Sequence, residues 1–260
     1  WLASVGGAKL GAFARARRGL VTRLQQALQG SGAPVLWVHC PSLGEFEQGR
    51  PVLESLRKKF PAHHILLTFF SPSGYDVRKN YPHASHVTYL PLDTVWSVRD
   101  FIRTANPQLV ILVKYDFWPN LLLELEDIGA PVVSVSSIFR PDQIYFGWFG
   151  RFFLKAIQTI DRFFVQDEDS AALLRKHGIT EIEVTGDTRF DRVTEICDVA
   201  QPVPEAEAFI AGHTAWVIGS AWPEDMIVIG DRINRNQGGE RFIVVPHEVD
   251  EDSQIGRAHV

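Results

Sequence analysis

Glu45 has the clearest chemical potential in this chain because of its position. It ends the stretch Trp-Val-His-Cys-Pro-Ser-Leu-Gly-Glu, residues 37–45. The apolar run at residues 35–38 predicts a buried strand, and a helical pattern follows from about residue 46 to residue 60. A strand, a short turn and a helix place a reactive group at the carboxyl edge of a parallel sheet. Glu45 could therefore be a general base, or simply a first-turn acid that favours the helix dipole.

Other polar side chains follow predicted strands at the points where those strands end. With Glu45, they are Ser71, Asp93, Asp116, Arg140 and Arg189. Because the carboxyl ends of parallel strands meet at one edge, the topology predicts that these residues converge. Ser71 before Pro72 is also an N-cap pattern. Its hydroxyl and that of Ser73 could cap a helix, or the helix N-terminus could hold an anionic group.

The order of apolar runs and helical patterns predicts the fold class. Seven predicted strands alternate with helical patterns, at residues 35–38, 64–68, 86–90, 109–113, 132–136, 162–165 and 183–186. This alternation predicts an α/β fold, a parallel sheet with helices on both faces and right-handed connections. A proline-marked linker follows at residues 201–204, and two more strands are predicted at residues 215–218 and 242–245. They begin a second Rossmann-like domain, too small as it stands to bury a core.

The chain divides into four predicted segments. Residues 1–30 hold a basic amphipathic helix, residues 31–200 the first Rossmann-like domain, residues 205–252 the start of the second, and residues 253–260 a non-native tail. The basic helix could be a solvated surface helix or could lie on an anionic membrane face, and both interpretations stay open. Residue 1 is Trp rather than Met, so we expect native sequence to precede it.

The composition is that of an ordinary globular protein. The 260 residues are 45% hydrophobic and 22% charged, and the net charge of -5 gives no indication of a nucleic-acid partner. Cys40 and Cys197 have no metal-site spacing and form no disulfide framework, which predicts two reduced thiols. The sequence contains no run of about 18 apolar residues, so it predicts no membrane span. No G-x-G-x-x-G follows a predicted strand, which argues against a dinucleotide-binding oxidoreductase.

Five motifs, in order and spacing, resemble those of the 3-deoxy-D-manno-octulosonic acid (Kdo) transferases of Gram-negative lipopolysaccharide synthesis. They are the stretch at residues 37–45, Ser-Pro-Ser-Gly at 71–74, Tyr-Leu-Pro-Leu-Asp at 89–93, Asp-Phe-Trp-Pro-Asn at 116–120 and Val-Thr-Gly-Asp-Thr-Arg-Phe-Asp at 184–191. The resemblance covers roughly residues 8–252. It implies a GT-B fold of two Rossmann-like domains, with the acceptor bound by the N-terminal domain and the nucleotide sugar by the C-terminal one.

The resemblance also implies the reaction. It is an inverting, metal-independent transfer of Kdo from CMP-Kdo to a lipid A precursor, without a further cofactor, at the cytoplasmic face of the inner membrane. The protein would be peripheral there or anchored by its N-terminus. Glu45 falls on the family's general base, a role that needs burial or a neighbour to hold the pKa near working pH. Asp116 and Arg189 fall on residues that stabilise the transition state, and a cation suits a departing CMP anion.

The remaining candidate residues are implied to bind substrates. They are Ser71, Ser73, Asp93 and Arg140 in the first domain, and Gly219, Ser220, Pro246 and His247 on the donor side. Many relatives carry Lys at the position of Arg189 and a longer acidic residue at the position of Asp116. Some relatives carry an acidic residue at the position of Lys114, so the role of Lys114 stays open. The chain ends before the family's later nucleotide motifs, so we predict no turnover by this polypeptide alone.

Two alternatives remain beside Kdo transfer. The first is another GT-B enzyme, a UDP-sugar transferase or epimerase, against which the motifs around Glu45 and Trp118 argue. The second is a non-catalytic lipid-acceptor-binding module. The basic helix and the aromatic stretch at residues 146–149 favour it, because basic and aromatic side chains suit an anionic lipid interface.

Overall fold

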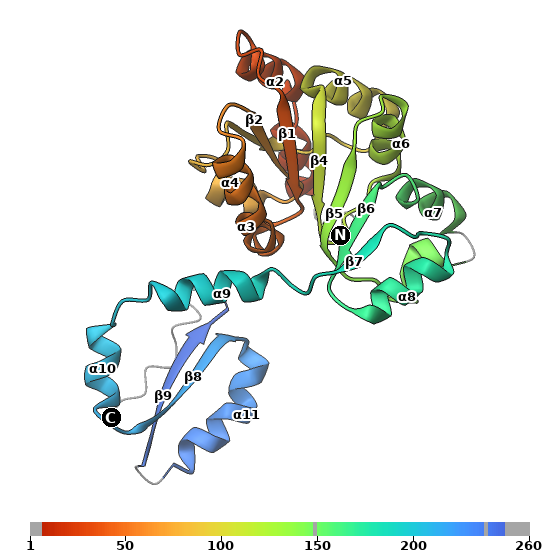
Figure 1. Ribbon diagram of the computed structural model, residues 1–260. Helices are drawn as coiled ribbons and strands as arrows, with labels where there is room; N and C mark the ends of the chain where they lie inside the picture. The colour runs from red at the N-terminus through yellow and green to blue at the C-terminus, as the bar shows by residue number, and fades with distance from the viewer. Residues whose placement is uncertain (1–6, 148–149, 237–238, 248–260) are drawn as a thin grey trace. The chain divides into compact units, whose positions relative to one another are not determined.

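The computed structural model describes residues 7–147, 150–236 and 239–247 of the chain (Figure 1). The chain divides into two compact units between Asp198 and Val199. None of the described helices is both long enough and apolar enough to cross a bilayer. Three of the predicted regions lie wholly or partly outside the described residues. They are the aromatic stretch at its residues 148–149, the end of the second domain at residues 248–252, and the predicted tail at residues 253–260.

The first unit is built on a seven-stranded parallel sheet. Its strands are β1 (Val35–Cys40), β2 (His64–Phe69), β3 (His86–Tyr89), β4 (Pro107–Val113), β5 (Val132–Ser137), β6 (Arg162–Val165) and β7 (Ile182–Val184). They lie in the order β3-β2-β1-β4-β5-β6-β7 (Figure 1). The predicted α/β class with a parallel sheet is therefore confirmed.

Helices cover both faces of this sheet. The helical elements of this unit are α1 (Gly7–Ala16), α2 (Leu20–Leu28), α3 (Leu43–Lys59), α4 (Pro72–Arg78), α5 (Val95–Ala105), α6 (Pro119–Asp127), a 3-10 turn η2 (Ile144–Phe146), α7 (Arg151–Ile157), α8 (Glu168–Lys176) and α9 (Arg189–Asp198). Trp37 packs with α2, α5 and α6 on one face, whereas its neighbour Val38 packs with Phe46 and Leu53 of α3 on the other. Because successive strand residues face opposite sides, a strand buried on both faces is continuously apolar.

The N-terminal segment differs from the single basic helix that we expected within residues 1–30. It forms two helices, because Gly19 adopts a left-handed conformation with φ of 65° that ends one helical path and begins another. Leu20 and Leu24 of α2 are buried in the core. Arg17 faces inward and donates to the carbonyl oxygens of Leu90 and Phe70 at 2.9 and 2.7 Å. Burial lowers the pKa of Arg17 to about 10.

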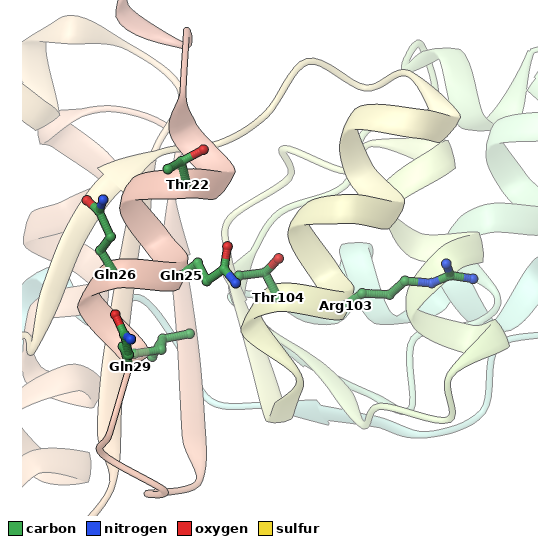
Figure 2. Close-up of a pocket in the computed structure, with 7 residues that line it drawn as sticks. Thr22, Gln25, Gln26, Gln29, Arg103 and Thr104 are labelled. Atoms are coloured by element: carbon green, nitrogen blue, oxygen red, sulfur yellow. The ribbon is translucent and has the colours of Figure 1, made fainter.

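A polar hollow of about 720 Å³ lies between α2 and α5 (Figure 2). Its lining residues are Thr22, Gln25, Gln26, Leu28, Gln29, Arg103 and Thr104. Since α2 and α5 end just before β1 and β4 begin, the hollow lies at the amino edge of the sheet. It is therefore remote from the strand ends at which the candidate catalytic residues were predicted.

The second unit contains α10 (Pro204–Ile210), β8 (Thr214–Ala221), α11 (Pro223–Asn234) and β9 (Glu240–Pro246). The two strands pair in parallel, with α11 as the crossover. The rings of Trp216 and Phe242 stack on one face of the pair with centroids 6.5 Å apart. This is a βαβ unit of the kind that the apolar runs in this region predicted.

Candidate active site

The centre of the first unit's sheet offers a crevice at its carboxyl edge. The chain leaves β1 toward β2 on one side and leaves β4 toward β5 on the other, although β1 and β4 are hydrogen-bonded neighbours (Figure 1). Such a reversal of direction is where open α/β sheets bind ligands. Glu45 follows β1, and Lys114 and Asp116 follow β4, so all three lie at this point.

Glu45 is held from both sides of its carboxylate. The helix α3 begins at Leu43, a few residues earlier than its sequence pattern indicated, because the side chain of Ser42 caps it by accepting from the Gly44 N–H at 3.2 Å. The Ser42 hydroxyl also donates to Glu45 Oε2. Lys114 Nζ donates to Glu45 Oε1 at 3.0 Å, and each of these two side chains is 20% exposed.

The ion pair determines the protonation of Glu45. Burial raises the pKa of this carboxyl group, but the hydrogen bonds from Ser42 and Lys114 and the charge of Lys114 outweigh burial, so the pKa is lowered overall. We expected a neighbour or burial to hold the pKa of a base near working pH. The neighbour present here favours the ionised form instead.

Lys114 adopts a backbone conformation that is uncommon for a residue with a side chain. Its φ is 71°, in the left-handed region. Its carbonyl oxygen accepts from the hydroxyls of Ser134 and Ser137 at 3.3 and 2.8 Å, and its N–H donates to the carbonyl of Val135 at 2.9 Å. These bonds from β5 fix the turn that aims the ammonium group at Glu45. The sequence signal was a lone Lys directly after the apolar run that ends at Val113.

Asp116 is held by two donors that share one of its oxygens. His39 Nε2 lies 3.1 Å from Asp116 Oδ2, and Trp118 Nε1 donates to the same oxygen at 2.9 Å. The Asp116 side chain is 27% exposed, whereas His39 is fully buried within β1. Sequence reasoning missed His39, because it lies inside an apolar strand pattern where a histidine gives no separate signal.

Arg189 is the first residue of α9, and its side chain forms hydrogen bonds with the loop that precedes this helix. Its guanidinium donates to Asp187 Oδ2 through Nε at 2.8 Å and Nη2 at 2.6 Å, and Gln48 of α3 donates to Asp187 Oδ1 at 2.9 Å. The hydrogen bond to Asp187 raises the pKa of Arg189, and the charge of Glu45 adds to this rise. The Arg189 side chain is 61% exposed, so the cation lies within the field of Glu45 and remains accessible to an anion.

The other predicted residues of the first unit do not join this cluster by any described contact. Ser71 caps α4, with Pro72 at the first helical position as predicted, and lies 3.0 Å from Ser73 through their hydroxyls. Asp93 accepts from the N–H groups of Asn120 and Leu121 at 3.1 and 2.9 Å and so caps α6. Burial outweighs these bonds and raises the pKa of Asp93.

The remaining positions lie at or beside the carboxyl ends of strands. Arg140 is exposed after β5. In the second unit, Ser220 has a φ of 58° and its hydroxyl lies 2.7 Å from His247 Nδ1, while the His247 ring stacks on Trp222 with centroids 4.0 Å apart. Gly219 and Pro246 lie near the ends of β8 and β9. Over residues 7–147, 150–236 and 239–247, no group of three or more His, Cys, Asp and Glu side chains could hold a metal ion.

The sequence matches a known family and several curated relatives. The model of the family 3-deoxy-D-manno-octulosonic-acid transferase (kdotransferase) matches residues 14–192. A 3-deoxy-D-manno-octulosonic acid transferase of Bordetella pertussis is 30% identical over 198 residues, which are 74% of this chain and 43% of the relative. One of Aquifex aeolicus is 38% identical over 89 residues, 34% of this chain and 24% of the relative. The matched regions span less than half the length of these two relatives.

Solved structures share the fold at low sequence identity. The UDP-GlcNAc 2-epimerase of Methanocaldococcus jannaschii has a TM-score of 0.57 at 14% identity, over 81% of this chain and 73% of that one. The Neisseria meningitidis enzyme has a TM-score of 0.56 at 15% identity, over 81% and 65%. These likenesses show an α/β fold of the GT-B type and nothing of the reaction. The family match and the ordered motifs around Glu45 show that this chain belongs to the 3-deoxy-D-manno-octulosonic acid transferase family.

Proposed function

We propose that this protein transfers Kdo from CMP-Kdo to a lipid A precursor in lipopolysaccharide synthesis, with Glu45 as the general base. The observation that carries the proposal is the position of the Glu45 carboxylate. It lies at the carboxyl edge of the sheet, where the chain leaves β1 and β4 in opposite directions, and on the first turn of a capped helix. The chain belongs to the Kdo transferase family. The likeness to epimerase structures concerns the fold, and the five motifs favour Kdo transfer over epimerisation.

The proposed step is a direct displacement. A hydroxyl of the acceptor sugar donates to Glu45, its oxygen attacks the anomeric carbon of Kdo, and the bond from that carbon to the CMP phosphate oxygen breaks. The hydroxyl proton passes to Glu45, CMP leaves as an anion, and attack from the face opposite to CMP inverts the anomeric carbon. Lys114 and Arg189 place two positive charges near Glu45, which suits the anionic leaving group and the carboxylate of Kdo.

The test is CMP release by the full-length protein with CMP-Kdo and a lipid A precursor. Glu45→Gln keeps the shape of the side chain and removes the proton acceptor, so we expect kcat to fall at least about 100-fold. Glu47→Gln is the matched control, because Glu47 lies two residues further on the same helix and pairs with Arg78 instead. Release that survives Glu45→Gln would discard the mechanism, and absence of release from the unmodified protein would discard the function.

We also propose that the protein works on the cytoplasmic face of the inner membrane. Arg15, Arg18 and Arg23 are exposed around α1 and α2, and basic side chains attract anionic lipid. Flotation with phosphatidylglycerol vesicles should carry the protein, and replacing these three arginines by glutamine should reduce its binding. Equal flotation with uncharged phosphatidylcholine vesicles would count against an electrostatic contact.

A further inference from the structure

A chain of buried polar side chains leads from the interior of the sheet to Asp116. Trp37 Nε1 donates to Thr68 Oγ1 at 2.8 Å, and Thr68 Oγ1 lies 2.9 Å from His39 Nδ1. His39 Nε2 then lies 3.1 Å from Asp116 Oδ2. Trp37, Thr68 and His39 are completely buried. This buried chain of hydrogen bonds ends at one partly exposed carboxylate, that of Asp116.

For a neutral His39 ring, the donors and acceptors of this chain agree with a single arrangement of protons. The indole of Trp37 can only donate, so Thr68 accepts from it. A carboxylate can only accept, so His39 donates to Asp116 from Nε2. In a neutral ring Nδ1 then carries no proton and accepts from the Thr68 hydroxyl, whose hydrogen is free for this bond. The opposite tautomer would set the lone pair of Nε2 against the carboxylate and leave a buried polar group unsatisfied.

Three neighbouring strands, β2, β1 and β4, fix the geometry of this chain. In the sheet register, His39 of β1 is paired with Thr68 of β2 on one side and with Leu112 of β4 on the other. Asp116 is four residues further along the chain from Leu112, in the turn after β4. Side chains on packed strands hold a neighbouring group more accurately than side chains on loops do. The loop carboxylate thus takes its orientation from β1 and β2.

We propose that His39 is a positioning residue for the transfer reaction, which holds Asp116 through an Nε2–H whose place is set by Trp37 and Thr68. His39 and Trp118 both occupy Oδ2, and within the described part of the chain no side chain or backbone group donates to Oδ1. Oδ1 is therefore the oxygen that accepts a hydroxyl of a bound sugar. The role that this inference gives to Asp116 in the reaction rests on the proposed function, whereas the proton arrangement does not.

The proton arrangement is tested by NMR on the chain labelled with 15N-histidine, with the His39 signals assigned by their loss in His39→Gln. We expect the His39 ring to carry its proton on Nε2 and none on Nδ1. Thr68→Val removes the hydroxyl at nearly equal volume and should shift the ring toward the other tautomer, whereas Thr68→Ser should not. A proton on Nδ1 in the unmodified chain, or identical spectra in the two Thr68 variants, would overturn the proposal.

The positioning role is tested by kinetics of the full-length protein with CMP-Kdo and a lipid A precursor. His39→Leu should lower kcat about 100-fold, because a displaced carboxylate no longer meets its substrate group. His39→Gln keeps an amide donor and should regain part of kcat at similar thermal stability. Equal losses of kcat in Leu and Gln variants of equal stability would overturn it. No turnover by the unmodified protein would instead refute the proposed function, and no effect of Glu45→Gln would refute its mechanism, and either outcome would leave the NMR result standing.

Discussion

The pairing of Glu45 with Lys114 governs how the proposed base responds to pH. The charged and titratable groups around Glu45 come from several elements. They are Cys40 of β1, Lys114 after β4 and Arg189 of α9. Burial raises the pKa of the Cys40 thiol, and the charges of Glu45 and Glu47 raise it further, so Cys40 stays a neutral neighbour. Of these groups, Lys114 is the one hydrogen-bonded to the Glu45 carboxylate.

Replacing Lys114 should move the acidic limb of the pH–activity profile. Because the native pKa of Glu45 is lowered, the ionised base is lost only when pH falls below the usual range of a glutamate, about 4.3. Lys114→Met removes a hydrogen bond and a positive charge, so the pKa of Glu45 rises. We expect the acidic limb of kcat/KM to shift to higher pH, measured in the transfer assay.

The same substitution has a stability consequence of known sign. A carboxyl group with a lowered native pKa stabilises the fold above its unfolded pKa, and this contribution disappears as pH falls through the native pKa. As pH falls below about 4.3, the free energy of unfolding of Lys114→Met should therefore decrease less steeply than that of the unmodified protein. Lys58→Met is the control, since Lys58 is exposed near the end of α3. An unchanged acidic limb in Lys114→Met would show that Lys114 does not tune Glu45.

At the scale of elements, α3 approaches the sheet closely enough to bring Glu45 to the strand ends. Gly49 lies about one turn after Glu45 on this helix. A Cβ at Gly49 would lie 2.8 Å from Val113 Cγ2 and 2.9 Å from Cys40 Sγ. Side chains of β1 and β4 thus touch the helix backbone at this position. The glycine is required by close packing rather than by a special backbone angle.

Gly49→Ala should therefore destabilise the first unit, although alanine is the better helix former. We expect a loss of about 1–3 kcal/mol in the free energy of unfolding, because Val113 has a stiff branched side chain and must shift. The measurement is urea unfolding followed by circular dichroism. Gly44→Ala on the same helix is the matched control. Its Cβ would meet only Ser42 Oγ at 3.8 Å, an ordinary contact, so little change is expected. Equal stability of the two variants would contradict this account of α3.

At the scale of the whole molecule, the two units differ in how much apolar surface they bury. The first unit has a hydrophobic core on each face of its sheet. Among the described residues of the second unit, only Ala221 is buried, while Val217, Ile227 and Val228 are exposed. A two-stranded sheet without a covered apolar face has marginal stability. The stability of this chain therefore resides in its first unit.

Separate fragments should behave accordingly. We expect residues 1–198 to unfold cooperatively with the main thermal transition of the whole chain, because that unit contains both cores. Residues 199–260 alone should show no cooperative transition, because they bury too little surface. Scanning calorimetry of the two fragments and the whole chain measures this. A cooperative transition in the short fragment, or none in the long one, would show that core burial does not set the stability of the two units.

The sequence determined the fold class and the place of Glu45. Strands such as β1 and β4 read as continuous apolar runs because both faces of the sheet are covered, and that pattern is local. The strand–turn–helix order was local too, and so was the N-cap at Ser71. The break at Gly19 was missed, since apolar residues keep helical spacing on both sides of it and a left-handed residue leaves no trace in that spacing.

The side chains that meet at the site are brought together by contacts that are distant in the sequence. Lys114 reaches Glu45 across 69 residues of sequence, and His39 reaches Asp116 across 77. Both contacts exist because β4 lies beside β1, a neighbour relation that strand patterns do not encode. The same holds for Asp93, which seemed free at a strand end but caps α6. Local periodicity specifies elements, whereas the partner of a polar side chain depends on the order in which those elements pack.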